Sequence, residues 1–154
     1  MGNLKNIKKE MQEFAFEKVD EVYTKNNKIF NEYKSLVEKM GMMIYNNGLI
    51  STVANFKANE YNKKGNKKYE YIAISNHINL WLTDKSIYKE FVHNGTSDEL
   101  LQRLLSIDNG RHLLALTKEA VKLSDALKEM VKARTSIVTN TNNNKSDENR
   151  QTDS

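Results

Sequence analysis

The chain has 154 residues, of which 38% are hydrophobic and 29% are charged. This balance fits one ordinary globular domain that is large enough to bury a core. Proline is absent and glycine occurs only six times, which favours helices and disfavours a turn-rich sandwich or barrel. Cysteine is absent too, which excludes disulfides, thiolate metal sites and cysteine nucleophiles.

The formal net charge is +4 at pH 7, and residues 139–154 hold two basic and three acidic side chains. The rest of the chain therefore carries about +5, which suits a polyanionic partner but serves solubility equally well. No apolar run approaches the roughly 20 residues that span a bilayer. The first residues, MGNLKNIKKE, lack the apolar stretch of a signal peptide. We therefore expect a cytoplasmic protein without a membrane partner.

Apolar residues recur at spacings of three and four, which predicts a series of amphipathic helices. The first covers residues 4–24, and Asn26-Asn27 interrupts it. The second runs from Phe30 to Ile44 and stops at Asn46-Asn47-Gly48, because Asn and Gly accept the left-handed backbone that closes a helix. Further helices are predicted at residues 50–61, 69–83 and 86–92, with a polar turn at 62–68.

The last third of the chain contains the clearest helical pattern. Thr96-Ser97-Asp98-Glu99 has the composition of a capping box and precedes a short leucine-rich helix. The final helix carries an apolar stripe and is predicted to fade near residues 134–138. The stripe consists of Leu113, Leu116, Ala120, Leu123, Leu127 and Met130.

From Thr139 onward the sequence TNTNNNKSDENRQTDS has no apolar residue. Such a segment cannot offset its ordering entropy by burial, so we predict that it is disordered. The fold predicted from sequence is all-α. It is a single compact bundle of about six helices over residues 1–138, followed by a disordered polar tail over residues 139–154.

The residues that could carry catalysis form no recognisable constellation. His77, His93 and His112 lie on separate predicted elements without metal-ligand spacing, so we expect isolated surface or helix-end histidines. Carboxylates are scattered among lysines, as on a solvated helix face. The phosphate-loop, dinucleotide-binding and nucleophile-elbow motifs are absent, and Trp81 is expected in the core. The sequence predicts a protein that is not an enzyme and has no cofactor and no metal site.

Binding is therefore the more promising role, and two groups of basic residues suggest where it occurs. Lysines surround the central turn with tyrosines among them. Lysine can contact phosphate, and a tyrosine ring can stack on an unpaired base. On the final helix, further lysines lie on the face opposite the leucine stripe, and an arginine lies near the start of the helix. Asp125 and Glu129 reduce the positive charge of that face. The first group is Lys57, Lys63, Lys64, Lys67 and Lys68 with Tyr61, Tyr69 and Tyr71; the second is Arg111, Lys118, Lys122 and Lys132.

The order of these features resembles the small subunit of the type III-B CRISPR effector complex, the Cmr small-subunit family. The similarity covers most of residues 8–134 and none of the tail. The chain departs from the family pattern at Ile50-Ser51-Thr52, where members often have smaller residues, and has lysines where the family often has arginines. The similar stretches are Phe14-Ala15-Phe16-Glu17-Lys18-Val19, Ile44-Tyr45-Asn46-Asn47-Gly48-Leu49, Val53-Ala54-Asn55-Phe56-Lys57-Ala58, Ile78-Asn79-Leu80-Trp81-Leu82 and residues 111–132.

This resemblance implies a non-catalytic subunit of an antiviral, RNA-guided complex. It implies stacking in several copies beside the other subunits of the complex, and contact with guide RNA and target RNA. Two alternatives stay open: the small subunit of the related type III-A complex, and a helical adaptor that binds protein and not RNA. An enzyme whose site forms only on oligomerisation is the least favoured. The predicted RNA contacts are Lys18, Lys57, Arg111, Lys118 and Lys122 first, and Lys63, Lys64, Lys67 and Lys68 second.

Overall fold

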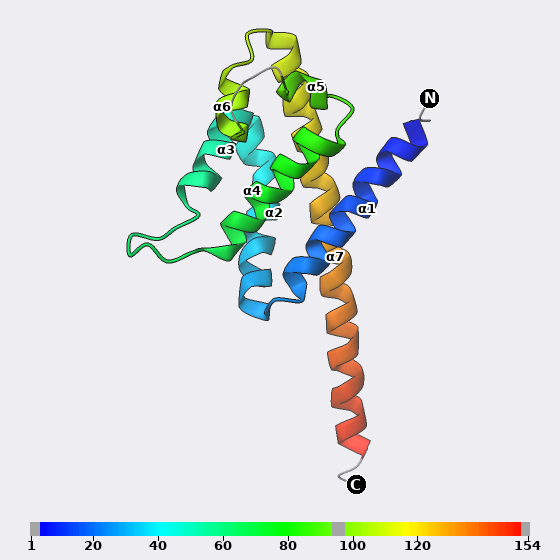
Figure 1. Cartoon of the computed structure of the whole chain (residues 1–154). Helices are drawn as coiled ribbons and strands as arrows, with labels where there is room; N and C mark the ends of the chain where they lie inside the picture. The colour runs from blue at the N-terminus through cyan, green and yellow to red at the C-terminus, as the bar shows by residue number, and fades with distance from the viewer. Residues whose placement is uncertain (1–3, 94–97, 152–154) are drawn as a thin grey trace.

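The structure is a computed structural model that describes the backbone of residues 4–93 and 98–151 and the side chains of residues 6–93 and 98–135. Across those backbone ranges the chain forms helices joined by short connections, without a strand (Figure 1). The predicted all-α class is therefore confirmed. The helices are α1 (Leu4–Tyr23), α2 (Asn27–Asn47), α3 (Leu49–Ala58), α4 (Tyr69–Leu80), a π-helical turn (Trp81–Lys85), α5 (Lys89–Val92), α6 (Leu100–Leu105) and α7 (Gly110–Gln151).

Asparagine and glycine set the two ends of α2; the stop at Gly48 was predicted, whereas Asn26-Asn27 was predicted only as a break after the first helix. The Asn26 side-chain oxygen accepts a hydrogen bond from the Ile29 backbone N–H at 2.8 Å. At the other end, Gly48 has a φ of 87°, and its N–H donates to the Ile44 carbonyl at 2.8 Å. Only glycine adopts this backbone without strain, so the chain turns at Gly48 and enters α3 at once.

A π-helical turn is the main departure from the predicted helix over residues 69–83. The α-helical pattern stops at Leu80, and the Ser86 N–H donates to the Trp81 carbonyl, five residues back, at 2.7 Å. The extra residue in this turn rotates the chain so that Trp81 and Leu82 both lie in the core, with 2% and 0% exposure. The Ser86 side chain then accepts from the Tyr88 N–H ahead of α5.

The core lies where α7 packs against α1 and α2, while α4 covers α2 and α3 (Figure 1). Trp81 sits near its centre, with its ring centroid 5.2 Å from that of Phe14 on α1. Its indole Nε1 donates to the carboxylate of the buried Glu119 on α7 at 2.9 Å. The predicted stripe of α7 faces this core: Leu116, Ala120, Leu123 and Leu127 are fully buried, and Leu113 and Met130 pack against its edge.

The backbone of α7 continues through Gln151, beyond the end predicted near residues 134–138. Residues 139–151 contain neither proline nor glycine, so no residue type there interrupts a helix. The domain boundary at residue 139 and the disordered tail stay predictions, since the side chains beyond residue 135 lie outside those described. The predicted stop at Asn94-Gly95 and the Thr96 hydroxyl of the capping box also fall outside the described residues. The capping box itself is wrong, because α6 begins at Leu100, so Glu99 precedes the helix and its carboxylate pairs with Lys57. No helix in the described part is both long and apolar enough to cross a bilayer.

Candidate nucleic-acid interface

Three of the predicted RNA contacts lie together on the solvent side of α7. Arg111, Lys118 and Lys122 are seven and four residues apart, so their Cα atoms fall within about 40° of each other around the helix. All three are exposed. They line one shallow groove of about 210 Å³ with Tyr88 and Leu114. Lys132, the fourth basic residue that the sequence analysis grouped with them, does not line this groove. Contact of the other three with RNA stays a prediction.

The start of α7 adds a second source of positive potential to this groove. The Asn109 side-chain oxygen accepts from the Arg111 N–H at 2.9 Å and caps the first turn. Arg111 therefore lies in the first turn, where the helix dipole favours anions. The groove also contains the Glu119 carboxylate, which is 3% exposed and bonded to the Trp81 indole. Three cations and one mostly covered carboxylate leave the groove net positive.

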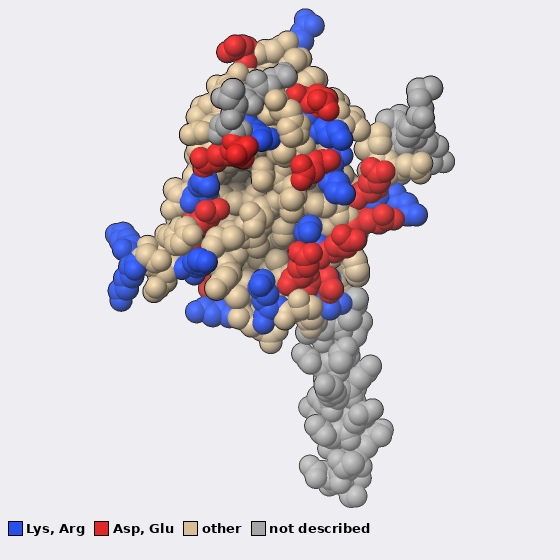
Figure 2. Space-filling model, viewed as in Figure 1, with Lys and Arg blue, Asp and Glu red and all other residues tan. Residues whose placement is uncertain are grey.

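The turn between α3 and α4 is a compact, hydrogen-bonded projection. The Asn62 side-chain oxygen accepts from the backbone N–H groups of Lys64 and Asn66, both at 2.9 Å. Gly65 has a φ of 80°, which allows the tight reversal. The turn extends away from the helices, and basic side chains gather at its tip (Figures 1 and 2). The exposed lysines of this turn are Lys63, Lys64 and Lys67.

Two lysine–tyrosine pairs lie at the base of this turn. The Lys68 ammonium is 5.5 Å from the Tyr71 ring centroid, and the Lys25 ammonium is 5.9 Å from that of Tyr69. The Tyr69 ring is 50% exposed. Sequence reasoning missed Lys25, because it lies in the connection between α1 and α2, far from the turn along the chain. The structure therefore adds Lys25 to the basic surface around residues 62–68.

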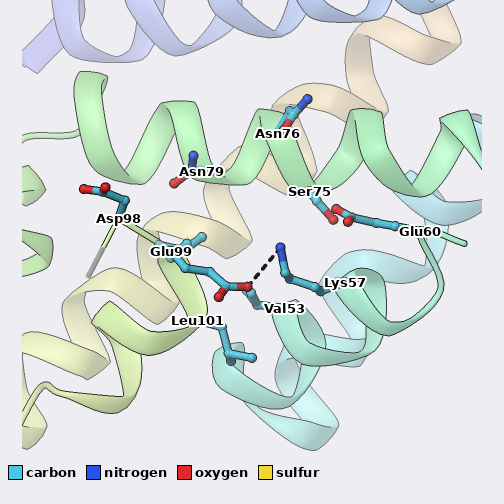
Figure 3. A pocket seen from close by; sticks show the side chains of 10 residues that line it. Val53, Lys57, Glu60, Ser75, Asn76, Asn79, Asp98, Glu99 and Leu101 are labelled. Atoms are coloured by element: carbon cyan, nitrogen blue, oxygen red, sulfur yellow. Dashed lines mark ion pairs between the residues drawn. The ribbon is translucent and has the colours of Figure 1, made fainter. Parts of the chain in front are cut away.

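Lys57 lies apart from both groups, in a pocket of about 620 Å³ between α3, α4 and the start of α6 (Figure 3). Its ammonium forms an ion pair with the Glu99 carboxylate at 2.9 Å. That hydrogen bond raises the pKa of Lys57, so the side chain stays charged but paired. Because Glu60 and Asp98 line the same pocket, the surroundings of Lys57 are less favourable for phosphate than the groove on α7.

Lys18 is also set apart, since its side chain is only 19% exposed. Its ammonium is 3.2 Å from the Glu21 carboxylate and 5.6 Å from the centroid of the Phe14 ring. The structure thus brings together the set on α7 and the set on the turn. It leaves Lys18 and Lys57 in separate, partly neutralised places, and their contact with RNA stays a prediction.

Of the two positions expected for histidines, His77 takes the helix end, in the last turn of α4, and not the surface. This residue is 4% exposed, and its Nδ1 shares a hydrogen bond of 2.7 Å with the Tyr33 hydroxyl. Burial, with the charge of Lys18 adding to it, lowers the pKa of His77 to about 3, so the imidazole is neutral at pH 7. Burial likewise raises the pKa of Tyr33, which keeps its proton. The pair therefore serves to join α2 and α4.

Within the described part of the chain, no group of three or more His, Asp or Glu side chains is placed so that it could hold a metal ion. The described residues thus form an all-α fold with one basic groove on α7 and a basic turn that projects between α3 and α4. Residues 7–134 match the family described as CRISPR-associated protein (Cas_Cmr5). The chain belongs to this family, the small subunits of type III-B Cmr complexes, which are in general non-catalytic accessory subunits that associate with the other subunits of a CRISPR complex.

Proposed function

We propose that the chain is a non-catalytic small subunit of a cytoplasmic type III-B CRISPR effector complex that stacks in several copies and binds guide and target RNA. The observation that carries the RNA-binding part is the groove on α7, where Arg111, Lys118 and Lys122 meet beside a helix N-terminus. Cations held on one rigid helix can follow a phosphate backbone without reading its sequence. Sequence specificity would then come from base pairing with the guide RNA, as in other RNA-guided systems.

A single copy offers only a few such contacts, so its own affinity for RNA is expected to be modest and to fall steeply with salt. Stacking would align the grooves of successive copies along one strand and multiply these contacts. The turn at residues 62–68 supports a second contact, because its lysines are exposed and the partly exposed Tyr61 and Tyr69 rings can stack on unpaired bases.

The test compares RNA binding by the wild-type chain and by an Arg111→Ala/Lys118→Ala/Lys122→Ala variant over a range of salt concentrations. For single-stranded RNA, losing three phosphate contacts should lower the slope of log affinity against log salt by about 2. The matched control removes the same charge from exposed lysines outside this groove, on α1, on α2 and on another face of α7, with Lys9→Ala/Lys39→Ala/Lys128→Ala. Equal loss of affinity in both variants would mean that only net charge matters and that the groove is not an RNA site.

A protein-binding adaptor remains the second candidate, because large apolar side chains are exposed near two helix ends. Tyr45 and Met42, close to the end of α2, are 84% and 62% exposed, and Leu105 at the end of α6 is 62% exposed. Purification from native cells at low salt separates the possibilities. Guide RNA with type III-B subunits supports the proposal, type III-A subunits indicate the related complex, and a protein partner without RNA, held independently of salt, supports the adaptor.

A further inference from the structure

The pocket around Lys57 has a chemistry that differs from the rest of this basic protein. It is lined by one cation and three carboxylates, and two of those carboxylates already have partners: Glu99 pairs with Lys57 at 2.9 Å, and Asp98 with Arg103 at 3.7 Å. The Glu60 carboxylate lines the same pocket and forms no ion pair with any described residue. The pocket therefore has a net negative charge although the chain as a whole is positive.

Further polar groups from α4 face this pocket. The Ser75 hydroxyl oxygen is buried and has no hydrogen-bond partner within the described residues. Figure 3 shows Ser75 beside Glu60, with Asn79 one turn further along the same helix. The Asn79 side-chain oxygen accepts from the Thr83 hydroxyl at 3.0 Å, which fixes its orientation. Buried polar groups are normally satisfied, so the Ser75 hydroxyl, which can both donate and accept, has capacity for a further hydrogen-bond partner.

Apolar side chains complete the pocket, with Val53 and Leu101 on the side opposite α4 (Figure 3). A ligand that fits would combine an apolar stem with a cationic head that has several N–H donors. Arginine has this combination: its methylene stem packs on apolar surface, and its planar guanidinium donates to several oxygens at once. A phosphate group is poorly matched, because Lys57, the only cation among the described residues that line the pocket, is already paired with Glu99.

We propose that this pocket between α3, α4 and α6 receives an arginine side chain from a neighbouring protein. The guanidinium would pair with Glu60 and donate to the Ser75 and Asn79 oxygens, while its stem lies against Val53 and Leu101. The pocket would thus be a protein-docking site separate from the groove on α7. It adds a contact to the proposed function and does not depend on RNA binding.

The test is an NMR titration of the full chain with the peptide acetyl-Gly-Arg-Gly-amide. We expect saturable shifts of the Asn79 side-chain amide and the Leu101 methyl signals. The same peptide with citrulline, a neutral analogue of arginine of the same shape, should bind roughly tenfold more weakly, because a charge-assisted hydrogen bond is lost. Glu60→Gln should lower the affinity for the arginine peptide by a similar factor. Glu38→Gln, at an exposed site on α2, should leave that affinity unchanged.

Equal binding of the arginine and citrulline peptides, or no saturable shift, would overturn the proposal. It would also be overturned if a short oligouridylate shifted these signals more strongly than the arginine peptide, because the pocket would then bind RNA. Circular dichroism of Glu60→Gln confirms that this variant folds, and Ser75→Ala gives a second, uncharged perturbation. RNA binding by the Arg111/Lys118/Lys122 variant is measured in a different assay, so failure of either proposal leaves the other untouched.

Discussion

Replacing the buried His77 by glutamine should remove a large part of the pH dependence of folding stability. In the folded protein the pKa of His77 is about 3, below its ordinary value of 6.5. The unfolded chain therefore binds a proton that the folded chain does not, at every pH between these two values. Because the unfolded state holds more protons there, stability is highest above pH 6.5 and is lost as the pH falls.

The size of this effect follows from the two pKa values. Between pH 7 and pH 5, protonation of His77 in the unfolded state should lower the free energy of unfolding by about 2 kcal/mol. For a chain of this length that corresponds to a fall in melting temperature of roughly 4–8 °C. Protonation of the folded protein would instead force a charged imidazole into the site beside Tyr33, near the charge of Lys18.

The assay is urea unfolding of wild-type and His77→Gln proteins at pH 5 and pH 7. Carboxylates that titrate in this range contribute equally to both proteins, so the difference between the two pH dependences isolates the imidazole. Asn76→Ala, at an exposed and non-titratable position on the same helix, serves as the control and should keep the wild-type dependence. An identical loss of stability on acidification in the wild-type and His77→Gln proteins would refute the reasoning.

Three further predictions concern buried contacts. Burial and the neighbouring carboxylate of Glu32 on α2 raise the pKa of Glu70 above 4.5, so ionisation of Glu70 destabilises the fold as the pH rises through that raised pKa. Glu70→Gln should therefore raise the melting temperature at pH 7, and an equal gain at pH 3 would contradict this cause. Glu119→Ala should lower the free energy of unfolding, measured in urea, by about 1–3 kcal/mol, because it leaves the Trp81 N–H without its acceptor. Glu119→Gln should lower it less, and equal losses in the two variants would show that this hydrogen bond is not the reason. A Cβ added to Gly41 would lie 3.0 Å from the Ser124 Oγ, so Gly41→Ala should be better tolerated in a Ser124→Ala background; additive effects of the two substitutions would show that α2 and α7 have room there.

Sequence alone determined the local features of the fold, because each depends on neighbouring residues. The stop at Gly48, the break at Asn26-Asn27 and the stripe of α7 were all predicted, since a helical period and the residues that end a helix act within one or two turns. The capping hydrogen bond of Asn26 was not predicted. The same locality explains why Lys118, Lys122 and Lys132 were correctly predicted on the exposed face of α7, with Arg111 near its start. Family membership also followed from ordered motifs that are readable along the chain.

Only the tertiary structure decided which side chains from different helices meet. His77 and Tyr33 are 44 positions apart, and no periodicity shows that they share a hydrogen bond. The ion pair that neutralises Lys57, and the approach of Lys25 to Tyr69, likewise depend on how helices and their connections pack. Such contacts depend on crossing angles and on one π-helical turn, which the spacing of apolar residues does not encode. The sequence could therefore identify candidate basic residues. Only the packing of the helices shows which of them lie in an open groove and which already form ion pairs.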